Sequence, residues 1–555
     1  MRGTVRSGWL NKLTELGLLN IVFSIFGGLA LFLYAIKQLS NSLKKSASSI
    51  LYRMINKLTD NPVKGMIAGT LTTFTVQSSS ITVITLLGLV NSGILRFDNA
   101  LNVMLGSEIG TTITAQIVAV KVGNLFLPIM AVGFFLRYFT KNTKLKRTGE
   151  VVFSFGLIFL AMHLMIEGVK PLKDIPEFVN TLKTFGNIPI LGIIWGAVFT
   201  AIIQSSSATT CLIIAMGIDG AINLKSAIAL IFGANLGTCA LELIAAISTS
   251  PATKRTALSQ VMINIISIMI FYPFISQFAD VVLQTSTSLA RQIANAHTIF
   301  NVAGSLIILI ILKPFKRLIT IIIPEDTKTQ KPETMIFENR LLNLPYFAIE
   351  HVKKKVNTLA DITMGMINHS TKAFFEQKDE SADQVFKREE VVDELTIRCL
   401  DYLQNIKKHQ LDIKAEKIKQ NLLDATIDIE RVADQCVNIA GFAKQKVKFT
   451  EEQEQRLREV FMLTRKTFMY AVETLKKPSK SNCEMTFKLE NELDYKEKQT
   501  REQYLKETKQ ETQDSVHNYI YVETLRNLER IGDHADNIAG YYYQAKYKDY
   551  HLLQV

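Results

Sequence analysis

The stretches GTLTTFTVQSSSIT (residues 69–82) and GAVFTAIIQSSSAT (residues 196–209) decide the fold. They lie inside the apolar segments 65–95 and 187–218, which are long enough to enter or cross a lipid bilayer. Each segment is interrupted near its middle by Gln-Ser-Ser-Ser. An unbroken membrane-spanning helix has no need of such an interruption, so we expect both segments to form re-entrant helical hairpins.

The two stretches belong to an internal duplication. Sliding the sequence by 127 residues superposes 69–112 on 196–239 without a gap, and 12 of the 44 aligned positions are identical. All but one of the identities fall on polar residues and glycines, which generic apolar sequence does not produce. They include Gly69/Gly196, Thr73/Thr200, the whole Gln-Ser-Ser-Ser cluster, Thr82/Thr209, Gly93/Gly220, Gly106/Gly233, Gly110/Gly237 and Thr111/Thr238.

Loop charge predicts how the duplicated halves are oriented. The connections 37–64 and 137–147 are strongly basic, so both are expected in the cytoplasm. The first hairpin then enters from the cytoplasmic side and the second from the opposite side. This is the inverted-repeat plan of secondary transporters, with repeats at about 19–140 and 148–323. One conflict remains, because the scheme places the N-terminus outside despite Arg2, Arg6 and Lys12.

Other apolar segments complete an all-α membrane domain. They are expected at 19–37, 99–120, 124–139, 151–169, 223–249, 257–276 and 293–323. We therefore predict a polytopic transmembrane domain at 1–323, a linker at 324–340 and a soluble helical domain at 341–555. Residues 1–323 carry 26 Lys and Arg against 11 Asp and Glu, whereas the remainder carries 37 against 40. The basic residues lie in short connections rather than in one patch, which argues against nucleic acid as a partner.

The residues at the two interruptions suit an anion and Na⁺. A half-helix that begins inside the membrane offers free N–H groups and a positive dipole end to an anion. Serine hydroxyls donate to phosphate oxygens, and Gln, Ser and backbone oxygens are hard ligands for Na⁺. Small polar residues also pack membrane helices together, but the cluster occurs twice at matching positions. No nucleophile and base set or phosphate-loop motif indicates an enzyme, and the five scattered cysteines indicate neither disulfides nor a zinc site.

The soluble part contains a second duplication. Glu430-Arg431-x-x-Asp434-x-x-x-Asn438-Ile439-Ala440 recurs 99 residues later as Glu529-Arg530-x-x-Asp533-x-x-x-Asn537-Ile538-Ala539. Two further carboxylate pairs recur at an offset of 101. Paired carboxylates on adjacent helices bind multivalent cations, although a single pair is more often a solvated helix face. The candidate metal ligands are Glu389, Asp393, Glu430, Asp434, Glu490, Asp494, Glu529 and Asp533.

The doubled Gln-Ser-Ser-Ser, with Gly-Ala-Asn-Leu-Gly-Thr at 233–238, resembles the type II sodium/phosphate cotransporter family over about residues 19–323. This resemblance implies that both clusters surround inorganic phosphate. The implied phosphate-binding residues are Gln77, Ser78, Ser79, Ser80, Gln204, Ser205, Ser206 and Ser207. The sodium-binding candidates are Thr82, Thr209, Asn235, Glu108, Thr111 and Thr238. Glu108 stands where the family has Asn, which leaves the sodium stoichiometry open and admits proton coupling.

Residues 341–547 resemble PhoU, a regulator of phosphate uptake built from two three-helix bundles whose family binds metal through Glu-x-x-x-Asp motifs. The resemblance implies a cytoplasmic regulatory domain, with Mg²⁺, Mn²⁺ or iron as the favoured metals. The leading hypothesis is therefore symport of phosphate with Na⁺ across the cytoplasmic membrane. Another oxyanion, phosphate export and a membrane-anchored phosphate sensor remain as alternatives. The sequence leaves the oligomeric state open, with a homodimer as one option.

Overall fold

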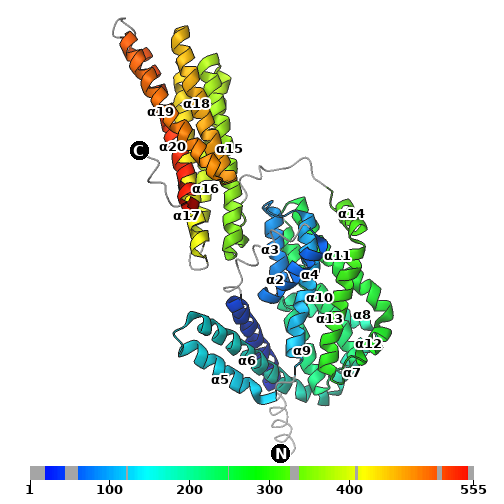
Figure 1. The fold of residues 1–555 in the computed structure, drawn as a ribbon. Coiled ribbons are helices and arrows are strands. Elements are labelled where there is room, and N and C mark those ends of the chain that lie inside the picture. The colour runs from blue at the N-terminus through cyan, green and yellow to red at the C-terminus, as the bar shows by residue number, and fades with distance from the viewer. Residues whose placement is uncertain are drawn as a thin grey trace, which may run out of the picture. The chain divides into compact units, whose positions relative to one another are not determined.

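The computed structural model describes residues 19–43, 61–120, 123–247, 249–324, 337–406, 411–508 and 515–547. Within these ranges the chain forms helices and no strands, as the sequence predicts. It divides into two compact units, Met1–Thr329 and Gln330–Val555 (Figure 1). The division falls inside the segment 324–340, for which the sequence predicts a linker.

Five helices in the first unit are long and apolar enough to cross a membrane. They span Leu19–Leu43, Thr143–Asp174, Leu224–Ala246, Pro251–Leu283 and Leu289–Ile310. A sixth candidate is the pair α7 (Pro176–Asn187) and α8 (Pro189–Ile203), which is bent by 112°. The described part of the chain therefore has the helices that a polytopic membrane domain needs.

The segment 65–95 is a helical hairpin. It consists of α2 (Pro62–Val76) and α3 (Ser79–Asn91), and α4 (Phe97–Val118) follows. Gly65 near the start of α2 lies against Asn102 near the start of α4, and Gly110 further along α4 lies against Thr73. Because α2 and α4 run parallel in register, α3 must carry the chain back by the length of α2.

The segment 187–218 repeats this arrangement with α8, α9 (Ser206–Asp219) and α10 (Leu224–Ala246). Gly192 in α8 lies against Ala229 in α10, and Gly237 in α10 lies against Thr200 in α8. The chain again leaves along one helix and returns along the next.

Matching glycines bring the paired helices into backbone contact. A Cβ on Gly106 would lie 1.8 Å from the Met66 carbonyl oxygen, and a Cβ on Gly233 would lie 2.0 Å from the Ile193 carbonyl oxygen. Both pairs of positions are 127 residues apart, so the sequence duplication is also a duplication of contacts. Only glycine fits where two helix backbones approach this closely.

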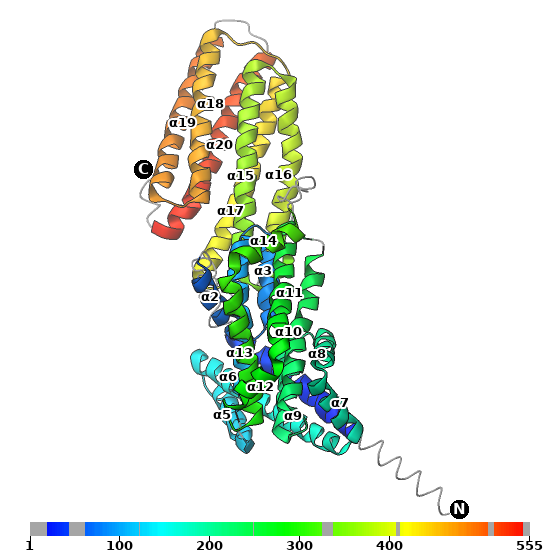
Figure 2. The same cartoon turned by 90° about the vertical axis from the view of Figure 1, so that its right-hand side faces the viewer.

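The two hairpins open toward different ends of α10. The open end of the first hairpin lies near the end of α10, because Asn91 Oδ1 accepts a hydrogen bond of 3.1 Å from the Ser250 backbone N–H. The open end of the second lies near the start of α10, where Gly192 meets Ala229. Figures 1 and 2 show the labels of α3 and α9 toward opposite ends of this unit. Orientation relative to a membrane stays a prediction.

Two elements of the first unit differ from the sequence expectation. The expected segment 293–323 is divided at Ile311 into α13 (Leu289–Ile310) and α14 (Leu312–Ile322). Pro314 explains this break, because proline has no N–H to continue the helical ladder and its ring displaces the preceding turn. Helix α7 was not expected, since its amphipathic sequence lies between the expected apolar segments 151–169 and 187–218.

The remaining helices of this unit surround the hairpins. The pair α5 (Phe126–Tyr138) and α6 (Thr143–Val169) packs side by side, and α6 also contacts α9. Helix α11 (Pro251–Phe271) contacts α3, α4 and α10, and α12 (Ile275–Leu283) follows it. Helix α13 contacts α4, α9 and α10. Helices α11 and α13 thus each touch one hairpin and both of the long helices α4 and α10.

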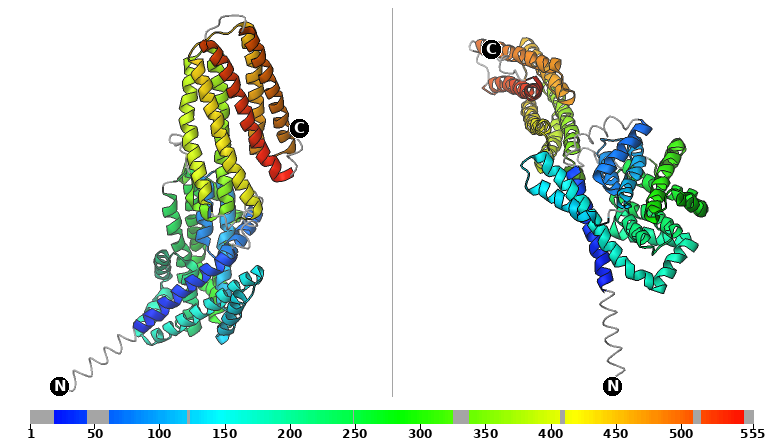
Figure 3. Two further views of the ribbon diagram at one scale, coloured as in Figure 1. Left: turned by 90° about the vertical axis from the view of Figure 1, so that its left-hand side faces the viewer. Right: turned by 60° about the horizontal axis from the view of Figure 1, so that its bottom comes forward.

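The second unit consists of six long helices, which Figure 3 shows lying lengthwise beside one another. One set of three packs together and comprises α15 (Pro345–Glu376), α16 (Asp379–Asn405) and α17 (Ile413–Ala443). The other set comprises α18 (Glu451–Lys476), α19 (Lys480–Thr508) and α20 (Ser515–Tyr547). Contacts of α17 with α20 and of α15 with α18 join the two sets. The unit is therefore a duplicated three-helix bundle.

We predict that Gly233→Ala destabilises the first unit, because the new methyl group would collide with the Ile193 carbonyl. Overpacking of this kind costs about 1–3 kcal/mol. Gly27→Ala is the matched control, since a Cβ there has nothing within 4 Å. Thermal melting of the detergent-purified proteins, followed by size-exclusion chromatography, should show a lower midpoint for Gly233→Ala alone. Equal midpoints for the two variants would show that the helices can separate without loss.

Candidate functional site

The first hairpin turns at Gln77. This residue ends α2 in the left-handed backbone region, with φ 55° and ψ 28°, and its N–H donates to the Thr73 carbonyl at 2.6 Å. Ser78 then caps α3, because its hydroxyl accepts a 3.3 Å hydrogen bond from the Ile81 N–H. The turn is closed by Thr73, whose hydroxyl donates to Thr82 Oγ1 at 3.0 Å.

The second hairpin turns in the same way at Gln204. Its φ is 59° and its ψ 28°, and its N–H donates to the Thr200 carbonyl at 2.7 Å. Ser205 caps α9 by accepting from the Ala208 N–H at 3.2 Å, and Thr200 Oγ1 donates to Thr209 Oγ1 at 2.8 Å. Both turns leave the first N–H groups of a half-helix beside two buried serines, Ser79 and Ser80 or Ser206 and Ser207.

The side chains of the two glutamines differ. Gln77 is 4% exposed, and its Oε1 accepts a hydrogen bond of 2.7 Å from the Thr114 hydroxyl. Gln204 is exposed, and the position that matches Thr114 is Leu241, which has no hydroxyl to offer. The duplication therefore fixes the backbone of both turns but the side chain of only one.

The structure places the threonine candidates for sodium on the hairpins and on the long helices. The hydroxyls of Thr82 and Thr209 donate to the carbonyls of Ser78 and Ser205 at 3.1 and 3.2 Å. On the long helices, Thr111 Oγ1 donates to the Ser107 carbonyl at 3.0 Å, and Thr238 Oγ1 donates to the Asn235 carbonyl at 2.7 Å. In each case a lone pair of the hydroxyl oxygen stays available to a cation.

Glu108 and Asn235 occupy matching positions on α4 and α10, and both are buried. Glu108 accepts a hydrogen bond from Gln260 Nε2 on α11. Asn235 Nδ2 donates to Asn301 Oδ1 on α13 at 2.8 Å, and Asn235 Oδ1 lies 3.2 Å from His297 Nε2. Each long helix is therefore tied by a buried polar contact to a helix outside the repeated stretch.

Sequence reasoning did not propose Gln260, Asn264, His297 or Asn301 as site residues. Their signal was spacing, because Gln260/Asn264 and His297/Asn301 are i, i+4 pairs on single faces of otherwise apolar helices. The two Gln-Ser-Ser-Ser clusters are not joined by any hydrogen bond within the described residues. The structure thus brings each cluster together with its own repeat, and leaves their joint contact with one phosphate a prediction.

In the second unit the eight predicted carboxylates fall into two groups. Glu389 and Asp393 on α16 face Glu430 and Asp434 on α17, since these four groups interact electrostatically. The second group holds Glu490, Asp494, Glu529 and Asp533, and it lies between α19 and α20. Pairs that are distant in sequence therefore meet across neighbouring helices, as the duplicated frame predicts.

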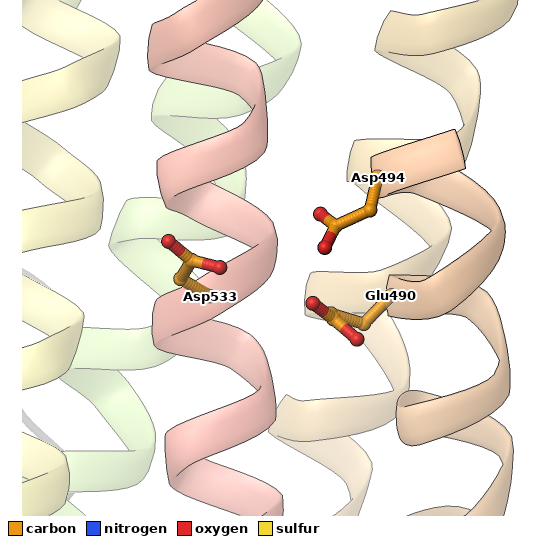
Figure 4. Close-up of side chains that lie close together, drawn as sticks. All are labelled: Glu490, Asp494 and Asp533. Atoms are coloured by element: carbon orange, nitrogen blue, oxygen red, sulfur yellow. The ribbon is translucent and has the colours of Figure 1, made fainter. Parts of the chain in front are cut away.

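The second group is geometrically the tighter one. One carboxylate oxygen from each of Glu490, Asp494 and Asp533 lies within 4.8 Å of the others, and Figure 4 shows Asp533 facing the other two across the helix pair. Desolvation by burial, and then the charges of Asp494 and Asp536, raise the pKa of Glu490 to about 8. The pKa values of Asp494 and Asp533 are also raised, chiefly by desolvation. Gathered acceptors of this kind suit a multivalent cation.

One histidine, His534, interacts electrostatically with carboxylates of both groups. His534 Nδ1 lies 2.7 Å from Asp428 Oδ1, and Tyr541 donates to Asp428 Oδ2 at 2.6 Å. His534 follows Asp533 on α20 and interacts electrostatically with Glu430 and Asp434 of the other group. The contact between α17 and α20 thus places one imidazole between the two carboxylate groups.

Comparison with known proteins assigns both units. The profile of the family described as Na⁺/Pi-cotransporter matches residues 31–167 and 170–296, and each match contains one of the two Gln-Ser-Ser-Ser clusters. The profile of the PhoU domain matches residues 356–443 and 457–541, one match for each three-helix set. Among solved structures, PhoU from Pseudomonas aeruginosa is 17% identical, with a TM-score of 0.36 over 37% of this chain and 99% of its own.

Individual relatives cover one or both units. YqeW of Bacillus subtilis, which is uncharacterised, is 30% identical over 288 residues, or 51% of this chain and 94% of its own. YjbB of Escherichia coli, provisionally named an inorganic phosphate export protein, is 23% identical over 66% of this chain and 68% of its own. Sodium-dependent phosphate transport protein 2A of Rattus norvegicus is 34% identical over 20% of this chain and 17% of its own. The chain thus belongs to the Na⁺/Pi-cotransporter family and carries a PhoU domain after its membrane unit.

Proposed function

We propose that the protein is a sodium-coupled secondary transporter of inorganic phosphate in the cytoplasmic membrane, rather than an enzyme. The observation that carries this proposal is the pair of matched helix breaks at Gln77 and Gln204. Each break ends one half-helix and starts another beside buried serines, inside a hairpin whose outer surface is apolar.

Phosphate fits these breaks by its charge and its oxygens. The N-termini of α3 and α9 present the positive end of a helix dipole, and Ser79, Ser80, Ser206 and Ser207 add hydroxyl donors. Such donors bind an anion without a fixed cationic side chain. Release then requires no ion pair to be broken, which suits transport better than storage.

Sodium fits as the charge that travels with phosphate. Thr82 and Thr209 place hydroxyl oxygens next to the carbonyls of the two turns, and Glu108, Asn235, Thr111 and Thr238 supply oxygens on α4 and α10. Oxygen ligands at a broken helix are a common sodium site in secondary transporters. Bound Na⁺ would offset the negative charge of phosphate at this site.

The proposed mechanism is alternating access between inverted repeats. The open ends of the hairpins meet different ends of α10, as the contacts of Asn91 and Gly192 indicate. Two hairpins entering from opposite sides would hold phosphate near the middle of the membrane. Movement of one hairpin against the long helices would then open the site to one side at a time.

Export, another oxyanion and phosphate sensing without transport are the competing functions. YjbB favours export, whereas transport protein 2A favours sodium-dependent transport. Uptake of labelled phosphate into proteoliposomes, with sodium gradients of either direction and with sulfate or arsenate as competitors, separates these functions. A protein that binds phosphate but moves none would be a sensor.

Our first functional prediction is that Gln77→Ala and Gln204→Ala each reduce sodium-dependent phosphate uptake by at least about tenfold, which corresponds to about 1.4 kcal/mol. Both side chains stand at the hairpin turns, where we expect them to line the proposed phosphate site. Gln284→Ala, an exposed glutamine at the end of α12, is the matched control and should transport normally. Normal uptake by both hairpin variants would remove the hairpins as binding elements.

A second prediction concerns topology. Lys144 lies at the start of α6, and Glu177 lies at the start of α7, just past the short extension of α6. A 27-residue helix such as α6 spans about 40 Å. Single cysteines at these positions, in a background without the native cysteines, should react with a membrane-impermeant thiol reagent from opposite sides, Lys144 from the cytoplasm. Labelling of both from one side would exclude the inverted arrangement. Lys57, a second expected cytoplasmic position, lies outside the described residues.

We further propose that the PhoU domain is cytoplasmic, binds Mg²⁺, Mn²⁺ or iron through its two carboxylate groups and regulates transport. A raised carboxyl pKa means that the folded state binds a proton more tightly than the unfolded state. The raised pKa of Glu490 therefore stabilises the folded state below a pH of about 4.5, and this stabilisation is lost as the pH rises toward about 8. A bound cation would replace those protons at neutral pH.

The expected result is that Mn²⁺ slows hydrogen exchange of α16, α17, α19 and α20 in the full-length protein at about pH 8, and has less effect at about pH 5. Asp434→Asn with Asp533→Asn should abolish the effect and change the rate of phosphate uptake without ending it. Asp361→Asn is the control, because Asp361 pairs with Lys476 away from both groups. If Mn²⁺ protects the double variant equally, the carboxylates are only a solvated face.

A further inference from the structure

Among the described residues of the membrane unit, Glu242 is the most deeply buried carboxylate. Its side chain is 0% exposed, and neither of its carboxylate oxygens has a hydrogen-bond partner. It lies on the face of α10 that also carries Asn235 and Cys239, because positions i, i+4 and i+7 share one helix face. A charged group in this position must be neutralised by something other than its own neighbours.

The donor groups around Glu242 are used by other acceptors, and the Cys239 thiol, for example, approaches the Asn235 carbonyl at 3.9 Å. Glu108 on α4 is the charged side chain that interacts with Glu242 among the described residues. Glu108 holds the amide nitrogen of Gln260, and the other amide atom, Gln260 Oε1, is fully buried without a partner. The nearby amide of Asn264 is already used, since its Nδ2 donates to the Gln260 carbonyl at 3.1 Å and approaches Cys239 Sγ at 3.6 Å.

Three buried acceptor atoms, two on Glu242 and one on Gln260, therefore have no donor, and a second carboxylate lies close by. No donor in the described part of the chain reaches these three atoms, and water alone supplies no charge to offset two carboxylates. A cation resolves both problems at once. Sodium is coordinated by carboxylate and amide oxygens. A proton instead converts one carboxylate into a carboxylic acid, whose O–H can donate a hydrogen bond to the other carboxylate or to the amide oxygen.

We propose that Glu242, Glu108 and Gln260 form a binding site for one monovalent cation, Na⁺ or H⁺, which is carried together with phosphate. This inference rests on the proposed transport function and adds a coupling site that the duplication does not contain. Both repeats supply oxygens at the candidate positions from Gln77 to Thr111 and at their counterparts from Gln204 to Thr238. Glu242 differs, because the matching position in the first repeat is Ala115. The first repeat therefore has no counterpart of the Glu242 carboxylate, although it supplies Glu108 to the site.

The alternative is that Glu242 remains a neutral acid throughout, as a packing residue. The two cases differ in transport stoichiometry. A coupling site gains and loses its cation in every cycle, whereas a permanently neutral acid contributes nothing to the number of cations moved. Glu242→Gln keeps the size of the side chain and removes its cation, so it separates the two cases.

The experiment uses the full-length protein in proteoliposomes with ³²P-phosphate, ²²Na⁺ and a trapped pH-sensitive dye. If the cation is Na⁺, Glu242→Gln lowers the number of sodium ions moved per phosphate by about one. If it is H⁺, the sodium count is unchanged and the proton flux per phosphate falls instead. Glu177→Gln, which changes an exposed carboxylate at the start of α7, should match the wild type in both ratios.

Unchanged ratios for both cations in a Glu242→Gln variant that still transports phosphate would overturn the proposal. If this variant does not insert, Glu242→Asp is measured instead. We expect its apparent cation affinity to fall at least about fivefold, because the carboxylate is withdrawn by one methylene group. An unchanged affinity contradicts the proposal.

A binding measurement separates this inference from the proposed transport function. Na⁺ or a lower pH should raise the melting midpoint of the detergent-purified wild type, since ligand binding to the folded state stabilises it. Glu242→Gln should lose that rise for one of the two cations. If the wild type moves no phosphate but shows the rise, the transport proposal fails and the cation site stands. If the rise is equal in both proteins, the cation site fails.

Discussion

A helix that stops inside an apolar layer leaves backbone N–H and C=O groups without partners, and this constraint shapes the membrane unit. The sequence solves it twice with the same residues. Gln77 and Gln204 adopt the left-handed region that most side chains avoid, so that their N–H groups return to Thr73 and Thr200. The carbonyl of Val76 is satisfied from outside the hairpin, by the Ser40 hydroxyl at 2.7 Å. What stays open at each break is the start of a half-helix, which is where an anion binds.

Close helix contact makes the breaks tolerable. Because α2 lies backbone to backbone along α4, and α8 along α10, each hairpin is held by one long helix through glycines at matched positions. These glycines and the polar interruptions are also what made both hairpins predictable from the sequence. The bend at Ile188 and the unexpected helix α7 were less accessible, because an apolar pattern does not record where neighbouring helices leave room for a turn. The break at Ile311 has a sequence signal, Pro314, but a search for apolar runs passes over it.

The site was predictable to the extent that it is repeated. The sequence suggested three sets of candidates because each set recurs at a fixed offset: the Gln-Ser-Ser-Ser clusters, Thr82 with Thr209, and the four carboxylate pairs. Gln260, His297 and Asn301 have no such counterpart, and their importance appears only when α11 and α13 are packed against α4 and α10. The same holds for His534, which was one histidine in a charged helix until the fold placed it between two acidic groups.

The differences between the repeats carry as much meaning as their likeness. In the proposed mechanism, exchanging the conformations of two inverted repeats exchanges the side to which the site is open, so identical repeats would give two states of equal energy. The Thr114 hydroxyl donates a hydrogen bond to the buried side chain of Gln77, whereas its counterpart Leu241 has no hydroxyl to offer to the exposed side chain of Gln204. In the alignment of the two repeats, Glu108 corresponds to Asn235, and Glu242 corresponds to Ala115. Each substitution gives one repeat a contact or a charge that the other lacks. In the proposed mechanism these buried positions contribute to the energy difference between the two states, and a cation that neutralises Glu242 would change that difference in every cycle.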